Sequence, residues 1–388
     1  GFMKTARRIC VVTGTRAEYG LLKPVISLLH DDPEVDLQLV ATGTHLSPGH
    51  GMTVTEIERD GFKPDARVEI DLSDDSRLGV ARAMAETIAK MSVALNDLRP
   101  VLVLGLGDRY EILATAQAAL ILAIPIAHIH GGEVTNGAFD DSIRHAITKM
   151  SALHFVATQE YARRVVQLGE QPGTVFNVGA LGVDLATSTK TVTHEVLEST
   201  LKHDLTKPLL LVTFHPTTRS GVSSKDEISE VLAALENFAY CSIVFTGVNA
   251  DPGSAENKNQ IANFVARDPE KRSMHDSLGQ VNYFSLMKIS EVVVGNSSSG
   301  IIEAPAMHVP TVNIGSRQDG RMRADSIIDV PPHSAQIQTA IETALSPSWR
   351  ERAAKTSGVY GAGNCAKTIA DTLKTANLGV QKTFFDLR

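Results

Sequence analysis

Cysteine is scarce in this sequence. Its 388 residues include only Cys10, Cys241 and Cys365, and no two of them form a CxxC pair. This spacing predicts neither a disulfide framework nor a zinc ribbon. Long apolar runs are also missing, because none approaches the roughly 20 residues of a membrane-spanning helix and the first residues contain no apolar signal segment. We therefore expect a cytoplasmic protein.

The sequence also lacks the motifs of several common catalytic classes. It contains no GxGxxG fingerprint, no P-loop motif, no GxSxG nucleophile elbow and no recognisable Cys–His pairing. A standard dinucleotide site, a P-loop site and covalent nucleophilic catalysis are therefore not expected.

Positive charge is in the minority. The 37 Lys and Arg residues against 44 Asp and Glu give a formal net charge of −7. This balance argues against nucleic acid or an anionic membrane as the main partner, although a few local arginines can still bind an anion at short range. Hydrophobic residues make up 43% and charged residues 21%, which is typical of a globular protein. The length exceeds one ordinary core, so we expect two domains.

Short β-branched runs alternate with amphipathic segments, a pattern typical of βαβ units and a parallel sheet. The sequence predicts an α/β protein with two Rossmann-like domains facing each other across a cleft, separated by a polar stretch near residues 180–207. The expected strands are residues 7–13, 36–42, 101–105, 124–130, 154–158 and 174–179 in the first half, and 209–216, 241–247, 291–296 and 311–315 in the second.

Charged side chains crowd the stretch from residue 101 to residue 145, just beyond two of the expected strands. In an open α/β sheet, ligands bind outside the carboxyl ends of the strands, so we expect the chemistry here. The crowded carboxylates should have pKa values that are pushed apart, which suits general acid–base catalysis. The candidate catalytic residues are Asp108, His130, Glu133, Asp140 and Asp141.

A metal site is the alternative for this stretch. On one strand, His128 and His130 would point to the same face, and with Asp108 and Glu133 they could bind a divalent metal as in a metallohydrolase. The sequence shows no complete ligand set. We therefore predict acid–base chemistry without a metal.

Other strand ends carry groups that suit an anion. The turn ending in Arg16 and the helix start at Ser297 and Ser298 could bind phosphate, although an ordinary turn and a simple N-cap are the alternatives. Arg317 begins an arginine cluster that could bind an anion or form a solvated loop. His215 lies at another strand end, which favours a place in the cleft. One helical turn beyond the serines, Glu303 could accept hydrogen bonds from a ribose.

At this point the sequence resembles the hydrolysing UDP-N-acetylglucosamine 2-epimerases. The motifs GTRAEYG, GDRYE, HIHGGE, DDSIRHAITKM, FHP, NSSSGIIE and GSRQ occur in the order found in that family and span residues 13–323. The resemblance implies a glycosyltransferase-B-like pair of Rossmann domains. We expect these to be residues 1–182 and 183–365, with a helical segment at 366–388 that packs back on the first domain.

The resemblance also implies a reaction in sialic acid biosynthesis. A base removes the C2 proton of UDP-N-acetylglucosamine, UDP departs to leave a 2-acetamidoglucal, and water adds to give N-acetylmannosamine, with no metal or redox cofactor. A rival substrate is the UDP- or GDP-linked 2,4-diacetamido-2,4,6-trideoxyhexose of the legionaminic acid pathway. Alternatives outside the class are a metallohydrolase and a non-catalytic nucleotide-sugar binding protein. The family implies a homodimer or homotetramer.

Site roles follow residue by residue from the resemblance. The nucleotide would contact Arg16, Arg109, His215, Asn249, Ser297, Ser298, Glu303 and Arg317, whereas Asp108, Glu133, Asp140 and Asp141 match acid–base positions. His130 stands where mammalian-type members carry a carboxylate, and it can act as an acid or a base near neutral pH. The loop before the aspartate pair is one residue longer here, which leaves Asp140 and Asp141 as alternatives.

Overall fold

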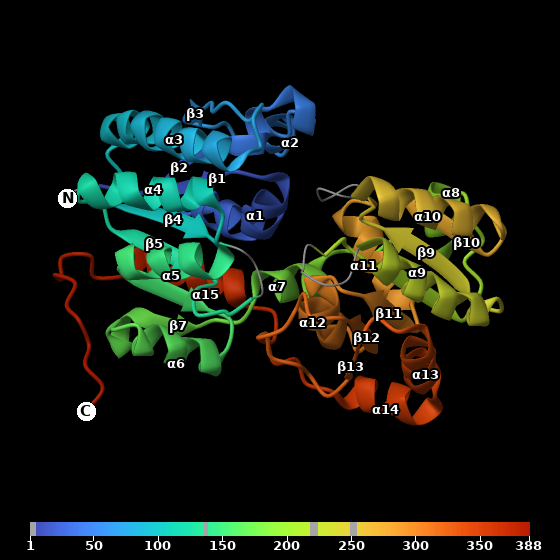
Figure 1. The fold of residues 1–388 in the computed structure, drawn as a ribbon. Helices are drawn as coiled ribbons and strands as arrows, with labels where there is room; N and C mark the ends of the chain where they lie inside the picture. Colours follow the sequence, from blue (N-terminus) through green and yellow to red (C-terminus); the bar gives the residue numbers. More distant parts are fainter. Residues whose placement is uncertain (1–4, 136–138, 218–223, 249–253) are drawn as a thin grey trace. The chain divides into compact units, whose positions relative to one another are not determined.

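The computed structural model describes residues 5–135, 139–217, 224–248 and 254–388, which form two compact units (Figure 1). The first unit comprises Gly1–Leu181 and Gly363–Arg388, and the second comprises Gly182–Ala362. The sequence predicted the corresponding boundaries between residues 182 and 183 and between residues 365 and 366. Within the part of the chain that the structure describes, no helix is both long and apolar enough to cross a membrane.

The first unit is built on a seven-stranded parallel sheet of order β3-β2-β1-β4-β5-β6-β7. Its strands are β1 (Arg7–Thr13), β2 (Val35–Thr42), β3 (Ala66–Val68), β4 (Leu102–Leu106), β5 (Ile126–Ile129), β6 (Leu153–Val156) and β7 (Val175–Asn177). Its helices are α1 (Arg16–Asp31), α2 (Val54–Arg59), α3 (Arg77–Leu98), α4 (Tyr110–Ile121), α5 (Asp140–Met150), α6 (Gln159–Gln167) and α15 (Cys365–Thr375), and α7 (Leu181–Ser188) begins at the boundary.

Both faces of this sheet are buried, which explains the continuous apolar runs of its strands. In β1, Ile9 and Val11 pack in one core with α1 and α15, whereas Cys10 and Val12 pack in another with α3, α4 and α5. The segment after residue 362 therefore belongs to the core of the first unit, where α15 contributes Ile369.

The second unit holds a six-stranded parallel sheet of order β10-β9-β8-β11-β12-β13. Its strands are β8 (Leu209–Thr213), β9 (Ser242–Thr246), β10 (Arg272–His275), β11 (Val292–Gly295), β12 (Thr311–Ile314) and β13 (Ile327–Val330). Its helices are α8 (His194–Leu201), α9 (Ser224–Leu235), α10 (Ser254–Ala266), α11 (Gln280–Ile289), α12 (Ser298–Ala306), α13 (Ser334–Leu345) and α14 (Pro347–Lys355). The predicted α/β class with two Rossmann-like domains is confirmed.

Candidate functional site

Arg144 on α5 organises the carboxylates of the first unit. Its side chain is only 3% exposed, and its two terminal nitrogens lie 2.5 Å from Asp108 Oδ2 and 2.5 Å from Asp141 Oδ1. The same guanidinium donates to the Glu133 carbonyl at 3.0 Å and to Thr135 Oγ1 at 2.9 Å. One buried cation thus joins the end of β4, the loop after β5 and the start of α5. We call Asp108, Glu133, Asp140 and Asp141 with Arg144 the carboxylate cluster.

The two adjacent aspartates of this cluster have different surroundings. Asp141 Oδ1 accepts from Arg144 and also from the Thr135 amide at 2.9 Å. Asp140 makes no hydrogen bond or ion pair with the described residues. Partial burial raises the pKa of Asp140, the carboxylates of Asp108 and Asp141 act in the same direction, and Arg144 opposes them. Asp140 is therefore the carboxyl group of the pair that is suited to exchange a proton.

The expectation that His128 and His130 share a strand face is wrong. β5 ends at Ile129, and His130 adopts a left-handed backbone conformation with φ of 69° while its amide donates to the Phe155 carbonyl. The His130 ring instead places Nδ1 3.3 Å from Glu133 Oε2. The pattern of alternating faces holds only while the backbone stays extended, so it ends with the strand.

His128 is fully buried and serves the fold. Its Nε2 lies 2.7 Å from the Gly107 carbonyl and its Nδ1 lies 3.0 Å from Thr148 Oγ1, so both ring nitrogens are engaged. Burial lowers the pKa of His128 to about 3, which keeps the ring neutral. Among the described residues, no three His, Cys, Asp or Glu side chains are grouped to hold a metal ion. With both nitrogens of His128 occupied, the metal alternative loses one of its four ligands.

Two of the three arginines expected at the nucleotide, Arg16 and Arg109, have partners of their own in the first unit. Arg109 forms a two-pronged pair with Glu111, with Nε to Oε2 and Nη2 to Oε1 both at 3.0 Å, and its side chain remains 43% exposed. Arg16 lies 3.0 Å from Glu56. In the turn before α1, the Gly14 amide donates to Glu18 Oε2 at 3.0 Å, so this turn already binds an internal carboxyl group.

In the second unit, Asn296 connects three strand ends. Its carboxamide accepts from the His215 amide at 2.7 Å and donates to the His215 carbonyl at 2.9 Å. Its main-chain carbonyl accepts from Arg317 Nη1 at 3.2 Å and from Gln318 Nε2 at 3.0 Å. Gly295 permits this close approach, because a Cβ there would lie 1.8 Å from the Thr213 carbonyl oxygen. We call His215, Asn296, Ser297, Ser298, Glu303 and Arg317 the anion cluster.

The serines and Glu303 of this cluster lie along α12. Ser297 caps the helix, since its hydroxyl accepts from the Ser299 amide, and Ser298 is the first helical residue. Within the part of the chain that the structure describes, the buried Glu303 Oε2 has no hydrogen-bond partner, and burial raises the pKa of Glu303 to about 7. Gly182 leaves room for this carboxyl group, because a Cβ at 182 would lie 2.5 Å from Glu303 Oε1. An unsatisfied buried oxygen is costly and suits a ligand that donates a hydrogen bond.

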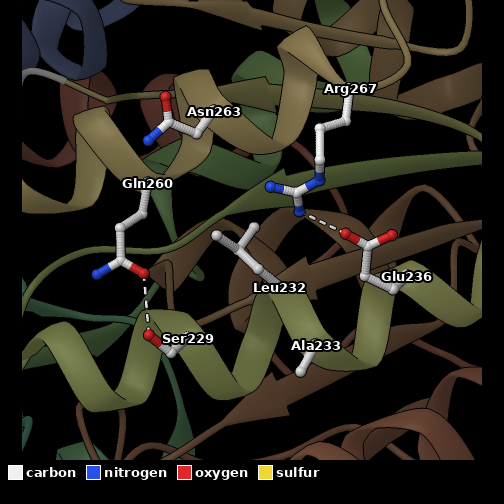
Figure 2. A pocket seen from close by; sticks show the side chains of 7 residues that line it. All are labelled: Ser229, Leu232, Ala233, Glu236, Gln260, Asn263 and Arg267. Atoms are coloured by element: carbon white, nitrogen blue, oxygen red, sulfur yellow. Dashed lines mark hydrogen bonds and ion pairs between the residues drawn. The ribbon is translucent and has the colours of Figure 1, made fainter.

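No residue of the anion cluster lines either of two hollows in the second unit. A cavity of about 740 Å³ lies at the carboxyl ends of β12 and β13, where Ser316 and Arg321 line it. A groove of about 340 Å³ between α9 and α10 contains none of the predicted site residues, and its polar side chains pair across it, Arg267 with Glu236 and Ser229 with Gln260 (Figure 2). The predicted contact at Asn249 lies outside the described residues.

Arg144 and Asn296 are two site residues that the sequence did not identify. The spacing of Asp141 and Arg144 offered a signal, because residues three apart on a helix are neighbours. Asn296 offered none, since its partners are brought together only by the order of the strands in the sheet.

Comparisons with known proteins identify relatives along almost the whole chain. The family model described as UDP-N-acetylglucosamine 2-epimerase matches residues 27–374. A Campylobacter jejuni protein named GDP/UDP-N,N′-diacetylbacillosamine 2-epimerase (hydrolyzing) is 41% identical over 83% of this chain and 84% of its own. The Escherichia coli polysialic acid biosynthesis protein P7 is 38% identical over 98% of both chains. A Legionella pneumophila UDP-N,N′-diacetylbacillosamine 2-epimerase (hydrolyzing) is 36% identical over 97% of both.

Solved structures resemble the fold. The crystal structure of UDP-GlcNAc 2-epimerase from Neisseria meningitidis bound to UDP-GlcNAc matches with a TM-score of 0.74 and 20% identity, covering 94% of this chain and 99% of that one. At this identity the likeness concerns the fold alone.

Proposed function

Because the chain belongs to the UDP-N-acetylglucosamine 2-epimerase family and is a hydrolysing 2-epimerase of UDP-sugars, we propose that it acts on a UDP-linked 2,4-diacetamido-2,4,6-trideoxyhexose. N,N′-diacetylbacillosamine is such a sugar, and the observation that carries the proposal is the 41% identity to the Campylobacter jejuni enzyme named for it. UDP-N-acetylglucosamine, the substrate that the motifs first favoured, is the second candidate, because the Escherichia coli relative is named for polysialic acid biosynthesis.

The proposed reaction has two steps that balance without a redox partner. A base takes the C2 proton while the C1–O bond breaks, and the bonding electrons leave with UDP to give a 2-acetamidoglycal. Water then adds across the double bond, with its hydroxyl at C1 and a proton delivered to C2 from the opposite face. The products are the free 2-epimer and UDP.

The carboxylate cluster supplies the proton transfers in this proposal. Asp140 takes the C2 proton, because its carboxyl group has no partner among the described residues and its pKa is raised. Glu133 and His130, 3.3 Å apart, form a second group that can pass a proton. Asp108, held by the buried guanidinium of Arg144, orients the sugar.

The anion cluster binds the nucleotide in the same proposal. The start of α12 presents backbone amides and the Ser298 hydroxyl to a phosphate, as helix N-termini commonly do. Arg317 and His215 are held at the same place by Asn296, and the buried Glu303 carboxyl group accepts a ribose hydroxyl. In the first unit, Arg16 and Arg109 are the side chains that we assign to the nucleotide.

A comparison of nucleotide sugars tests the substrate. We expect a higher kcat/KM with UDP-N,N′-diacetylbacillosamine than with UDP-N-acetylglucosamine, and one free UDP for each sugar released. In heavy water, mass spectrometry should find one deuterium bound to carbon in each product molecule. The GDP-linked form of the same sugar shows whether the nucleobase, guanine or uracil, affects kcat/KM. A higher kcat/KM with UDP-N-acetylglucosamine would reverse the substrate assignment, and epimerisation without UDP release would contradict hydrolysis.

Loss of the Arg317 guanidinium should weaken nucleotide binding. We expect Arg317→Ala to raise KM by about 10- to 100-fold, the worth of one charge-assisted hydrogen bond, with a smaller change in kcat. Steady-state kinetics and UDP calorimetry measure the two effects. Arg350→Ala removes an exposed arginine of α14 and serves as the matched control. Equal KM values for both variants would show that Arg317 does not contribute to nucleotide binding.

A further inference from the structure

Two buried carboxyl groups face Arg109 from the first turns of α1 and α4, which cover opposite faces of the sheet. Glu111 on α4 is fully buried, and both of its oxygens pair with the guanidinium. Glu18 on α1 is 7% exposed, and its Oε2 accepts from the Gly14 amide. Its Oε1 is buried, has no hydrogen-bond partner among the described residues and lies 4.0 Å from Arg109 Nε. One guanidinium therefore serves two carboxyl groups, and it satisfies only Glu111 fully.

The surroundings of Glu18 favour its neutral form. Burial raises the pKa of Glu18 to about 8; the Gly14 amide and Arg109 lower it, and Glu111 and Asp108 raise it. An ionised carboxylate with one unsatisfied buried oxygen is costly, whereas the protonated acid carries no charge into the interior.

No other charged group nearby reverses this preference. His45, which follows β2, is buried between Thr13 and Thr53, and burial lowers its pKa to about 4, so it stays neutral. Arg16, beside Glu18 in sequence, pairs with Glu56 of α2. Proton exchange on Glu18 therefore changes the net charge around Arg109.

We propose that Glu18 is a proton-linked positioning residue for Arg109. While Glu18 is neutral, the charges of Arg109 and Glu111 cancel, and the exposed edge of the guanidinium is available to an anion. Once Glu18 ionises, a second carboxylate attracts the guanidinium and the group of three becomes negative, which repels an anion. The inference rests on the proposed function, because the anion in question is the diphosphate of the nucleotide.

Thermodynamic linkage between proton binding and anion binding determines how the anion affinity should depend on pH. If the neutral form of Glu18 binds the anion better, anion affinity falls as pH rises through the pKa of Glu18, by about tenfold per pH unit at most for one proton. By reciprocity, binding of the anion takes up a proton. Because the pKa lies near 8, the loss should appear between pH 7 and pH 9.

Calorimetry of the full chain with UDP tests the inference. From pH 7 to pH 9 we expect the wild-type Kd to rise by about tenfold, with proton uptake that is visible in buffers of different ionisation enthalpy. Glu18→Gln keeps the neutral shape and should lose this dependence, leaving only a change of about twofold from the ionisation of Glu303, whose pKa is about 7. Glu69→Gln, an exposed carboxylate of the same unit, should follow the wild type.

A parallel pH dependence in Glu18→Gln and the wild type would overturn the inference while leaving UDP binding intact. A chain that binds no UDP at either pH overturns the proposed function instead. Infrared spectroscopy of the wild type decides the protonation state without relying on the variant. A carboxylic acid band should be half lost near pH 8, about one pH unit above the loss of the Glu303 band, and saturating UDP should shift the loss of the Glu18 band to higher pH; a band that does not respond to UDP contradicts the coupling.

Discussion

Asp140→Asn should lower kcat by about 10²- to 10⁴-fold, the usual worth of a general base, and leave the Kd for UDP unchanged. An asparagine has nearly the same shape as an aspartate, but it cannot accept the C2 proton. Because Asp140 pairs with no described residue, its replacement removes no ion pair from the folded protein. Release of free sugar, UDP calorimetry and thermal unfolding together separate the loss of chemistry from a loss of binding or folding.

Asp141→Asn is the matched control one residue along the helix. Asp141 pairs with the buried Arg144, so its loss should lower the unfolding temperature and affect kcat less than the loss of Asp140 does. Equal losses of kcat without a difference in stability would contradict the separate roles of the two residues.

The wild-type pH profile gives a second test of Asp140. A base must be ionised, so kcat should fall as pH drops through the pKa of Asp140. Partial burial raises that pKa, which places the acid limb above the ordinary aspartate range. An acid limb at or below the usual value for an exposed aspartate, about 3.9, would exclude Asp140 as the base.

The periodicity of the sequence predicted the interior strands of both sheets and one edge strand, β7, and missed the other three edge strands. Each of the ten expected strands corresponds to a strand of the structure. β3, β10 and β13 were missed, and they lie at three of the four sheet edges. They are three or four residues long, and in β10 the residues Arg272 to His275 read RSMH. An edge strand pairs on one side only and buries less surface, so its sequence carries a weaker apolar signal.

The sequence predicted where charged groups lie but not which of them pair. Asp108, Glu133 and the Asp140–Asp141 pair could be named because they follow apolar strands. The spacing of Asp141 and Arg144 indicated one pair, but the contact of Arg144 with Asp108 could not be predicted, because it forms only when the end of β4 and α5 are placed together. Glu18 was missed for the same reason, since its proximity to Arg109 depends on β1 and β4 being neighbours in the sheet.

Arg144→Met should cost about 3 kcal/mol of stability in the first unit, the lower end of the range for breaking a buried ion pair. The lower end applies because roughly a third of each carboxylate partner is exposed and water screens it. The substitution keeps the apolar stem but removes the cation between Asp108 and Asp141. It also leaves the Glu133 carbonyl and the Thr135 hydroxyl without this donor.

The sign of the pH dependence distinguishes lost charge pairing from lost packing. Without Arg144, the crowded carboxylates repel one another, so their pKa values in the folded variant should rise above the unfolded values. A folded state that binds protons more readily loses stability as pH rises. The loss of unfolding free energy in Arg144→Met, relative to the wild type, should therefore be smaller at pH 5 than at pH 8. Urea unfolding of wild type and variant at both pH values measures it. A deficit that does not change with pH would indicate packing alone.

A double-mutant cycle measures the coupling between Asp108 and Arg144. Asp108→Asn in the Arg144→Met background removes one of the two carboxylates that lost their cation, so it should cost less there than in the wild type, and it should restore part of the stability at pH 8. Arg144→Lys keeps one charge but cannot reach four acceptors in one plane, so its stability should lie between those of Arg144→Met and the wild type. Strict additivity of Asp108→Asn and Arg144→Met would show that the 2.5 Å contact between these side chains contributes nothing to folding.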